Sequence, residues 1–266
     1  MNGPAFSSAG NDDVRRFFVP AEQLTRDRVH LPADIAHHIS RVLRLKAGTE
    51  IALLDGRGTL CRCLLETTAG QHVTAIIQER HTSSETALPI DLCQGLPKAD
   101  KMELILQKGT ELGIRQFVPF ISERVIDRKA AERGEKRLER WRLIVREAAR
   151  QSHRLFLPEV VAPLPLSRVL ADCTAELKLL LWEDASQPLA TALPAPPPRS
   201  VALLIGPEGG FSAAEAGAAR QAGFIPVGCG PRILRTETAG FTVATILQYL
   251  YGDLQQLPKV EGDLSS

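Results

Sequence analysis

Over the second two thirds of the chain, short apolar runs alternate with segments of helical periodicity. Residues 201–205 are apolar throughout, which is typical of a strand buried on both faces. Leu138, Trp141 and Val145 recur at three- and four-residue spacing, which indicates an amphipathic helix. Strands are predicted at residues 89–96, 116–121, 177–182, 201–205 and 224–227. This alternation predicts an α/β fold whose parallel sheet is covered by helices on both faces.

The first third of the chain has a different pattern, in which short β-like runs follow one another. Such runs occupy residues 17–19, 50–54, 60–65 and 72–77, and one helix is expected at residues 33–45. Asp55-Gly-Arg-Gly58 lies between two of the runs and is a strong hairpin signal. These features predict a small β-barrel.

A polar linker at residues 81–86 divides the chain into two expected domains. We place a β-barrel at residues 15–80 and an α/β domain at residues 88–255. The first 14 residues are small and polar, so a disordered tail is expected there. They contain no apolar core of a signal peptide, and no run approaches the ~20 apolar residues of a membrane span. A cytoplasmic protein without membrane contact is expected.

Two glycine-rich loops follow predicted strands near the C-terminus. Gly206, Gly209 and Gly210 follow the run 201–205, and Gly228 and Gly230 follow the run 224–227. Glycine lets the backbone bend sharply and approach a ligand closely. Each loop precedes a helix, so both lie at the carboxyl ends of strands, where open α/β sheets bind ligands. The alternative is that they are only strand–helix turns with helix caps, as Ser212 and Glu215 would provide.

The chemistry of the loops narrows the class of ligand. Neither contains GxxxxGK[ST] or the dinucleotide pattern GxGxxG. Pro207 lacks an N–H group and Glu208 is acidic, and both properties disfavour a phosphate. A neutral or zwitterionic ligand with a large apolar or purine part is therefore expected.

Charge is distributed unevenly, although the net charge is only +1. Residues 124–154 contain eleven Lys and Arg against five acids. A solvated helix with internal salt bridges is one interpretation of this segment. The size of the excess favours contact with nucleic-acid phosphates.

Five cysteines, an odd number, do not indicate a disulfide framework. Cys61 and Cys63 lie two residues apart, but no second pair completes a zinc site. No metal is expected.

Several motifs together resemble one family. GPEGGFS at residues 206–212 and GPRILRTETA at residues 230–239 resemble the cofactor-binding loops of the SPOUT superfamily of RNA methyltransferases. Further motifs resemble the RsmE family of this superfamily. They are Arg15-Arg-Phe-Phe-Val19, Gln94-Gly-Leu-Pro-Lys98, Lys108-Gly-Thr-Glu-Leu-Gly113 and Glu147-Ala-Ala-Arg-Gln-Ser-His-Arg154. The resemblance spans residues 15–255.

The resemblance implies a methyltransferase that uses S-adenosylmethionine to methylate N3 of a uridine in small-subunit (16S) ribosomal RNA. It also implies a C-terminal trefoil knot, a PUA-like RNA-binding β-barrel and a homodimer that acts on ribosomal RNA or the small subunit. Two alternatives stay open: a related enzyme acting on tRNA or on a ribose 2′-hydroxyl, and a non-catalytic RNA-binding factor. The intact loops argue against the non-catalytic factor.

The cofactor is expected to contact the ends of the strands and both loops. Backbone groups would bind the adenine and methionine parts, and Ile233 and Leu234 would enclose the purine. The expected cofactor-binding residues are Leu181, Gly206, Pro207, Glu208, Gly209, Gly210, Val227, Gly228, Gly230, Ile233, Leu234 and Thr236. For Glu208, pinning its own loop through backbone N–H groups is favoured over a chemical role.

Methylation at uracil N3 requires an unpaired base and a deprotonated N3, so a base or a stabilising cation is needed. The catalytic candidates are Arg154, Arg235 and Glu237. The alternative role of Arg154 is phosphate binding. The alternative role of Arg235 and Glu237 is to form a salt bridge or to cap the last helix. The expected RNA-binding residues are Arg15, Arg16, Arg44, Arg146 and Arg150.

Overall fold

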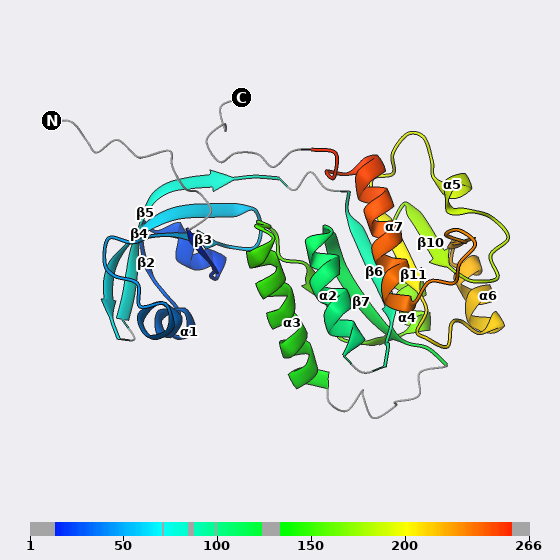
Figure 1. The fold of residues 1–266 in the computed structure, drawn as a ribbon, viewed down its shortest axis with the longest axis horizontal. Coiled ribbons are helices and arrows are strands. Elements are labelled where there is room, and N and C mark those ends of the chain that lie inside the picture. Colours follow the sequence, from blue (N-terminus) through cyan, green and yellow to red (C-terminus); the bar gives the residue numbers. More distant parts are fainter. Residues whose placement is uncertain (1–13, 71, 85–87, 99, 124–133, 257–266) are drawn as a thin grey trace. The chain divides into compact units, whose positions relative to one another are not determined.

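The computed structural model describes residues 14–70, 72–84, 88–98, 100–123 and 134–256 (Figure 1). Contacts divide the chain into two compact units. Of the described residues, the first unit contains those within 14–84 and 153–156, and the second contains those within 88–152 and 157–256. The expected disordered tail lies outside the described residues, apart from Val14. None of the described helices has the length and apolar content that crossing a bilayer requires.

The first unit contains a five-stranded sheet in the order β1-β3-β4-β5-β2. The strands are β1 (Arg15–Phe18), β3 (Glu50–Leu54), β4 (Thr59–Ala69), β5 (His72–Thr82) and β2 (Arg28–His30). The predicted hairpin joins β3 to β4, and the Asp55 carboxylate accepts the backbone N–H groups of Arg57 and Thr59 at 2.7 and 2.9 Å. Burial raises the pKa of Asp55, but these two bonds, together with hydrogen bonds from the Thr59 side chain and from its own backbone N–H, outweigh burial and lower it.

Two local predictions for this unit are wrong in their bounds, and two short elements were not predicted. The helix expected at residues 33–45 is α1 (Ala33–His37) followed by a π-helical turn, η3 (His38–Val42). Arg44 has a φ of 51°, a left-handed conformation that cannot continue a helix. The linker was placed too early, because β5 continues through Thr82. The short elements β2 and η2 (Ala21–Thr25) were not predicted.

The second unit contains a seven-stranded sheet in which every pairing is parallel, as predicted. The order is β12-β10-β11-β6-β7-β8, and β9 also pairs with β7. The strands are β6 (Ile90–Gly95), β7 (Ile114–Ile121), β8 (Glu159–Val160), β9 (Leu164–Pro165), β10 (Leu177–Leu181), β11 (Val201–Ile205) and β12 (Ile225–Val227). The order reverses beside β6, where open α/β sheets commonly bind ligands.

Helices cover both faces of this sheet (Figure 1). One face packs against α2 (Lys101–Glu111), α3 (Gly134–Gln151) and α7 (Thr236–Tyr251). The other packs against α4 (Leu166–Asp172) and α6 (Ala213–Gln221). The central strand β11 contributes side chains to the hydrophobic cores on both faces. Leu203 packs in the core that contains α2, α3 and α7, and Leu204 packs in the core that contains α4 and α6. The short helix α5 (Leu189–Ala192) contacts β12.

The last helix is tied to the start of the sheet by one buried amide. Gln248 Oε1 accepts the backbone N–H of Leu88 at 3.0 Å, and its Nε2 donates to the Leu88 carbonyl at 3.0 Å and to the Gly113 carbonyl at 3.3 Å. Gln248 is fully buried, so these bonds replace its contacts with water. α7 thus returns after β12 to the face of β6 and α2. The trefoil knot stays a prediction.

Candidate active site

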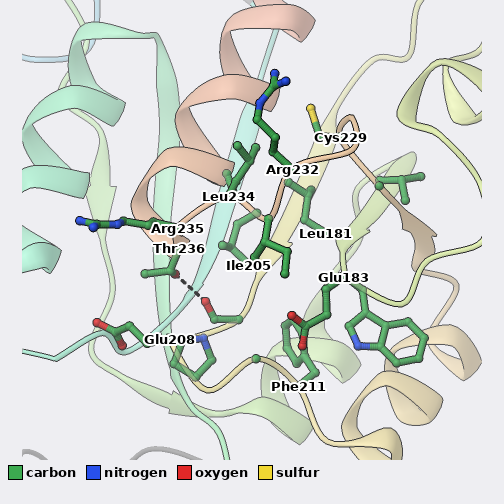
Figure 2. A pocket seen from close by; sticks show the side chains of 18 of the residues that line it. Leu181, Glu183, Ile205, Glu208, Phe211, Cys229, Arg232, Leu234, Arg235 and Thr236 are labelled. Atoms are coloured by element: carbon green, nitrogen blue, oxygen red, sulfur yellow. Dashed lines mark hydrogen bonds between the residues drawn. The ribbon is translucent and has the colours of Figure 1, made fainter.

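The candidate site lies where four strands of the parallel sheet end. Leu181 at the end of β10 pairs with Ile205 of β11 and Val227 of β12, and Ile205 pairs with Gln94 of β6. A cavity of about 480 Å³ lies beyond these strand ends (Figure 2). This volume is within the range of small-molecule sites.

The first glycine loop forms one wall of the pocket. Gly210 has a φ of 65°, and its N–H donates to the Pro207 carbonyl at 2.9 Å, which closes a tight turn. Ser212 and Glu215 then form the predicted capping box at the start of α6. Pro207 packs directly on Gly95, where an added Cβ would lie 2.6 Å from the proline ring. The end of β6 thus supports the loop from behind.

A buried hydrogen-bond chain connects the two loops. The Thr236 hydroxyl, at the start of α7, donates to the Gly206 carbonyl at 2.5 Å (dashed in Figure 2). It also accepts a hydrogen bond from Gln94 Nε2 at 2.8 Å. Thr236 is 7% exposed and Gln94 is fully buried. Buried polar groups of this kind are costly to leave unpaired, so the chain fixes the relative position of the two loops.

Glu208 is anchored by its neighbours across the loop. Its carboxylate accepts the backbone N–H of Lys98 at 3.1 and 3.2 Å and pairs with Lys101 Nζ at 3.0 Å. Burial raises the pKa of Glu208, but hydrogen bonds from its own backbone N–H, Lys101 and Lys98 outweigh burial and lower it. The same Lys101 ammonium lies 3.5 Å from Glu237 Oε2. The hydrogen bond to Glu208 in turn raises the pKa of Lys101.

The second glycine loop forms the opposite wall. Gly228 donates to the Gln187 carbonyl and accepts the N–H of Leu189, both at 2.9 Å, which fixes the loop against the segment before α5. Ile233, 83% exposed, and Leu234 give this wall an apolar surface. The Arg235 side chain extends outward from the loop (Figure 2).

The structure brings almost all of the expected cofactor residues together. The pocket is lined by Leu181, Gly206, Pro207, Glu208, Gly210, Val227, Gly228, Gly230, Ile233, Leu234 and Thr236. Gly209 is the exception, because it is exposed and does not line the pocket. Gly209 lies inside the turn that the Gly210–Pro207 hydrogen bond closes, and its contact with the cofactor stays a prediction.

The three catalytic candidates have different surroundings. Arg235 lines the pocket, whereas Glu237 does not line it and has a side chain only 12% exposed. Its ion pair with Lys101 is the salt-bridge role left open for it. Arg154 was expected at the end of the basic helix, but α3 ends at Gln151. Arg154 belongs to the first unit and is not among the residues that line the pocket.

Further lining residues were missed by the sequence analysis. They include Lys101, Trp182, Glu183, Phe211, Cys229 and Arg232. Trp182 and Glu183 directly follow the β10 strand, so the rule that places ligands at strand ends contained the signal. Lys101 gave no comparable signal, because a lysine in the first turn of a helix is usually solvated.

The expected RNA-binding arginines differ in accessibility. Arg15 of β1, Arg44 and Arg146 of α3 are exposed. Arg16 is only 9% exposed, because it alternates inward on β1, so its expected contact with phosphates is not supported. Arg150 hydrogen-bonds Glu147 one turn earlier on α3, with Nε 2.9 Å from the carboxylate.

Other cations of the basic segment also have internal partners. Arg140 pairs with Glu103 at 2.8 Å, and Arg137 lies over the Trp141 ring at 4.7 Å from its centroid. The salt-bridging interpretation therefore holds for part of α3. Residues 124–133, which contribute to the charge excess, lie outside the described residues.

Comparison with known proteins identifies the family. A model of the RNA methyltransferase domain matches residues 84–248, and one of the RNA methyltransferase PUA domain matches residues 31–78. Ribosomal RNA small subunit methyltransferase E of Bacillus subtilis is 32% identical over 251 residues, covering 89% of this chain and 96% of the relative. The chain belongs to this methyltransferase E family. The Synechocystis member is 36% identical over 229 residues, covering 84% of this chain and 74% of that protein.

Solved structures of similar methyltransferases have the same fold. The Neisseria gonorrhoeae enzyme, bound to S-adenosylmethionine, has a TM-score of 0.81 at 34% identity, covering 91% of this chain and 99% of that one. A Legionella pneumophila methyltransferase with the same cofactor has a TM-score of 0.83 at 33% identity and the same coverages. The α/β class with a parallel sheet and an N-terminal PUA-like domain is thus confirmed.

Proposed function

We propose that this protein transfers a methyl group from S-adenosylmethionine to N3 of a uridine in 16S ribosomal RNA. The observation that carries the proposal is the pocket at the strand ends, which both glycine loops line. Family membership supports it, because the curated relatives are ribosomal RNA small subunit methyltransferases and two similar structures contain this cofactor.

The pocket suits this cofactor. S-adenosylmethionine has an adenine, a ribose and a zwitterionic methionine part, and when bound it supplies a methyl group on a positively charged sulfur. Leu181, Ile205, Val227 and Leu234 provide apolar surface for the purine. An added Cβ at Gly230 would meet no atom within 4 Å, and one at Gly228 only the Gln187 carbonyl at 3.9 Å. The second loop therefore leaves space for a ligand beside its backbone.

The chain's own residues then have two tasks: positioning the reactants and stabilising the uracil anion. Thr236, Gln94 and Glu208 hold the loops in place, so little ordering is left for the moment of binding. Arg235 lines the pocket and carries a permanent positive charge. We assign to it the stabilisation of the negative charge that develops when N3 loses its proton.

Membership of the family also supports proposals about the domains, the oligomeric state and the location of the protein. We propose that residues 15–80 form the RNA-binding domain and residues 88–255 the catalytic domain, with Arg15, Arg44 and Arg146 contacting phosphates. We further propose a homodimer in the cytoplasm that acts on ribosomal RNA or the small subunit. The exposed Tyr249 and Leu250 of α7 support a partner surface, since large apolar side chains are rarely left in water together.

Two measurements test the proposal. Calorimetric titration of the full chain with S-adenosylmethionine should give saturable heat, and no heat at saturating cofactor would favour a non-catalytic RNA-binding factor. Mass-spectrometric mapping of uridines should then show a lost N3-methyl group in 16S rRNA from cells lacking the protein. Restoration by the purified protein is the control. Loss of a methyl group from tRNA, from a ribose or from no nucleotide would contradict the assigned substrate.

A further inference from the structure

We propose that Glu183 binds the positively charged part of the cofactor's methionine moiety, either the sulfonium or the α-ammonium group. This inference rests on the proposed function, which puts S-adenosylmethionine in the pocket. The cofactor brings two positive charges into a partly apolar site, and both lose water contacts on binding. A carboxylate positioned to meet one of them would offset that loss.

The fold fixes the backbone of Glu183 at the edge of the pocket, where the residue is exposed. It follows β10 by two residues, and the preceding Trp182 N–H donates to the Val227 carbonyl of β12 at 3.3 Å. An added Cβ at Gly210 would lie 3.4 Å from Glu183 Oε1, so the carboxylate lies against the backbone of the first glycine loop. Glu183 lines the cavity together with Phe211, and both side chains are drawn in Figure 2. Glu183 thus meets the cofactor pocket at the junction of β10 and the loop.

Of the acidic side chains that line the pocket, Glu183 is the one without a partner among the described residues, so it is available to bind a cation. The pocket is lined by two carboxylates, Glu183 and Glu208. Glu208 is occupied by Lys101 and by the Lys98 N–H group. Within the described part of the chain, Glu183 makes no hydrogen bond or ion pair. In Figure 2 the side chains of Arg232 and Arg235 extend away from it.

A carboxylate in such a site has one competing role, which is to accept hydrogen bonds from the ribose hydroxyls. The two roles differ in their dependence on charge. A neutral amide still accepts a hydrogen bond from a hydroxyl but loses most of its attraction for a cation. The isosteric variant Glu183→Gln therefore separates them, provided that ligands with and without the positive charges are compared.

The experiment is calorimetric titration of the wild type and Glu183→Gln with three ligands. S-adenosylmethionine carries both positive charges, S-adenosylhomocysteine keeps only the ammonium, and 5′-methylthioadenosine keeps adenine and ribose but neither charge. Asp184→Asn is the matched control, because this neighbouring acid is exposed, as Glu183 is, but does not line the pocket. Equal thermal melting of the three proteins establishes that each is folded.

We expect Glu183→Gln to lower the affinity for S-adenosylmethionine about tenfold and to leave 5′-methylthioadenosine within twofold. If S-adenosylhomocysteine weakens equally, Glu183 binds the ammonium, and if it does not, Glu183 binds the sulfonium; both outcomes support the proposal. Equal weakening of all three ligands assigns Glu183 to the ribose and overturns it. Unchanged affinity for all three, or the same loss in Asp184→Asn, also overturns it. A wild type that binds no S-adenosylmethionine contradicts the proposed function itself.

Discussion

At the scale of single residues, polar side chains position the backbone of the pocket. Glu208 is an example, since its carboxylate joins the first glycine loop to the Lys98 N–H group and the Lys101 ammonium. Thr236 does the same from the other side by binding the Gly206 carbonyl. The rigid glycine loops are thus held by a few neighbouring side chains, which makes their contributions measurable.

Replacement of Glu208 by Gln should make stability depend on pH in a defined way. The pKa of Glu208 in the folded protein lies below its ordinary value of 4.5, so the charged form stabilises the fold above that pH. The advantage of the wild type over Glu208→Gln should be about 0.5–1 kcal/mol at pH 7, a small value because the side chain is 26% exposed. It should disappear as the pH falls through the lowered pKa.

Urea denaturation at pH 7 and at a pH below the folded pKa measures this difference. Comparing the two proteins at each pH cancels the titration of every other group. A difference that stays constant with pH would contradict the ion-pair role of Glu208.

Removal of the Thr236 hydroxyl should destabilise the protein. Thr236→Val keeps the shape of the side chain but leaves the buried Gly206 carbonyl without its donor, at a cost of about 1–3 kcal/mol. The urea midpoint measures this loss. Thr238→Val, at an exposed position of the same helix, should change stability by less than about 0.5 kcal/mol. Equal effects of the two variants would show that the hydrogen bond is unimportant.

Arg235→Ala tests the assigned chemistry. Loss of the cation should lower kcat about a hundredfold, because the developing uracil anion loses its stabilising charge. The affinity for S-adenosylmethionine in calorimetry should change less than threefold. Arg168→Ala, at an exposed position of α4 outside the pocket, should retain full turnover. Unchanged single-turnover kinetics in Arg235→Ala would remove Arg235 from the mechanism.

At the scale of elements, close packing between strand and loop sets the shape of the site. Gly95→Ala should cost about 1–3 kcal/mol, because its Cβ would lie 2.6 Å from Pro207 and would push the first loop away from β6. Gly217→Ala is the contrasting change, since nothing lies within 4 Å of its Cβ inside α6. It should gain about 0.5–1 kcal/mol. Urea denaturation distinguishes the two, and equal shifts would contradict the packing argument.

The elements that could be predicted were those with strong local signals. The uninterrupted apolar run of β11 and the capping box of Ser212 and Glu215 were sufficient to place the first loop at a strand end. Two-residue strands such as β8 and β9 have no periodicity to detect, and only their pairing with β7 defines them. Lys101 was missed for a similar reason, because its ion pairs join residues far apart in the sequence. Glu183, by contrast, directly follows a predicted strand, so its place at a strand end was a signal that the analysis did not use.

At the scale of the whole molecule, the proposed homodimer gives a prediction for mass in solution. Light scattering should report twice the 29.0 kDa of one chain. Leu250→Lys puts a charge on the exposed apolar surface of α7 and should shift the mass toward that of one chain. Leu104→Lys, at a similarly exposed leucine of α2, should leave the mass unchanged. A wild type with the mass of one chain at micromolar concentration would contradict the dimer.

The Gln248 amide also has a consequence for the order in which the protein matures. A ribosome makes the chain from its N-terminus, so the segment around Leu88 emerges long before Gln248, whose amide hydrogen-bonds the Leu88 backbone in the folded protein. Until α7 has left the exit tunnel, the backbone groups of Leu88 lack this partner and the start of the helix cannot donate from Thr236 to Gly206. The α/β domain is therefore completed only by α7, and a chain that stopped before this helix would lack Thr236 and the hydrogen bond that joins the two loops.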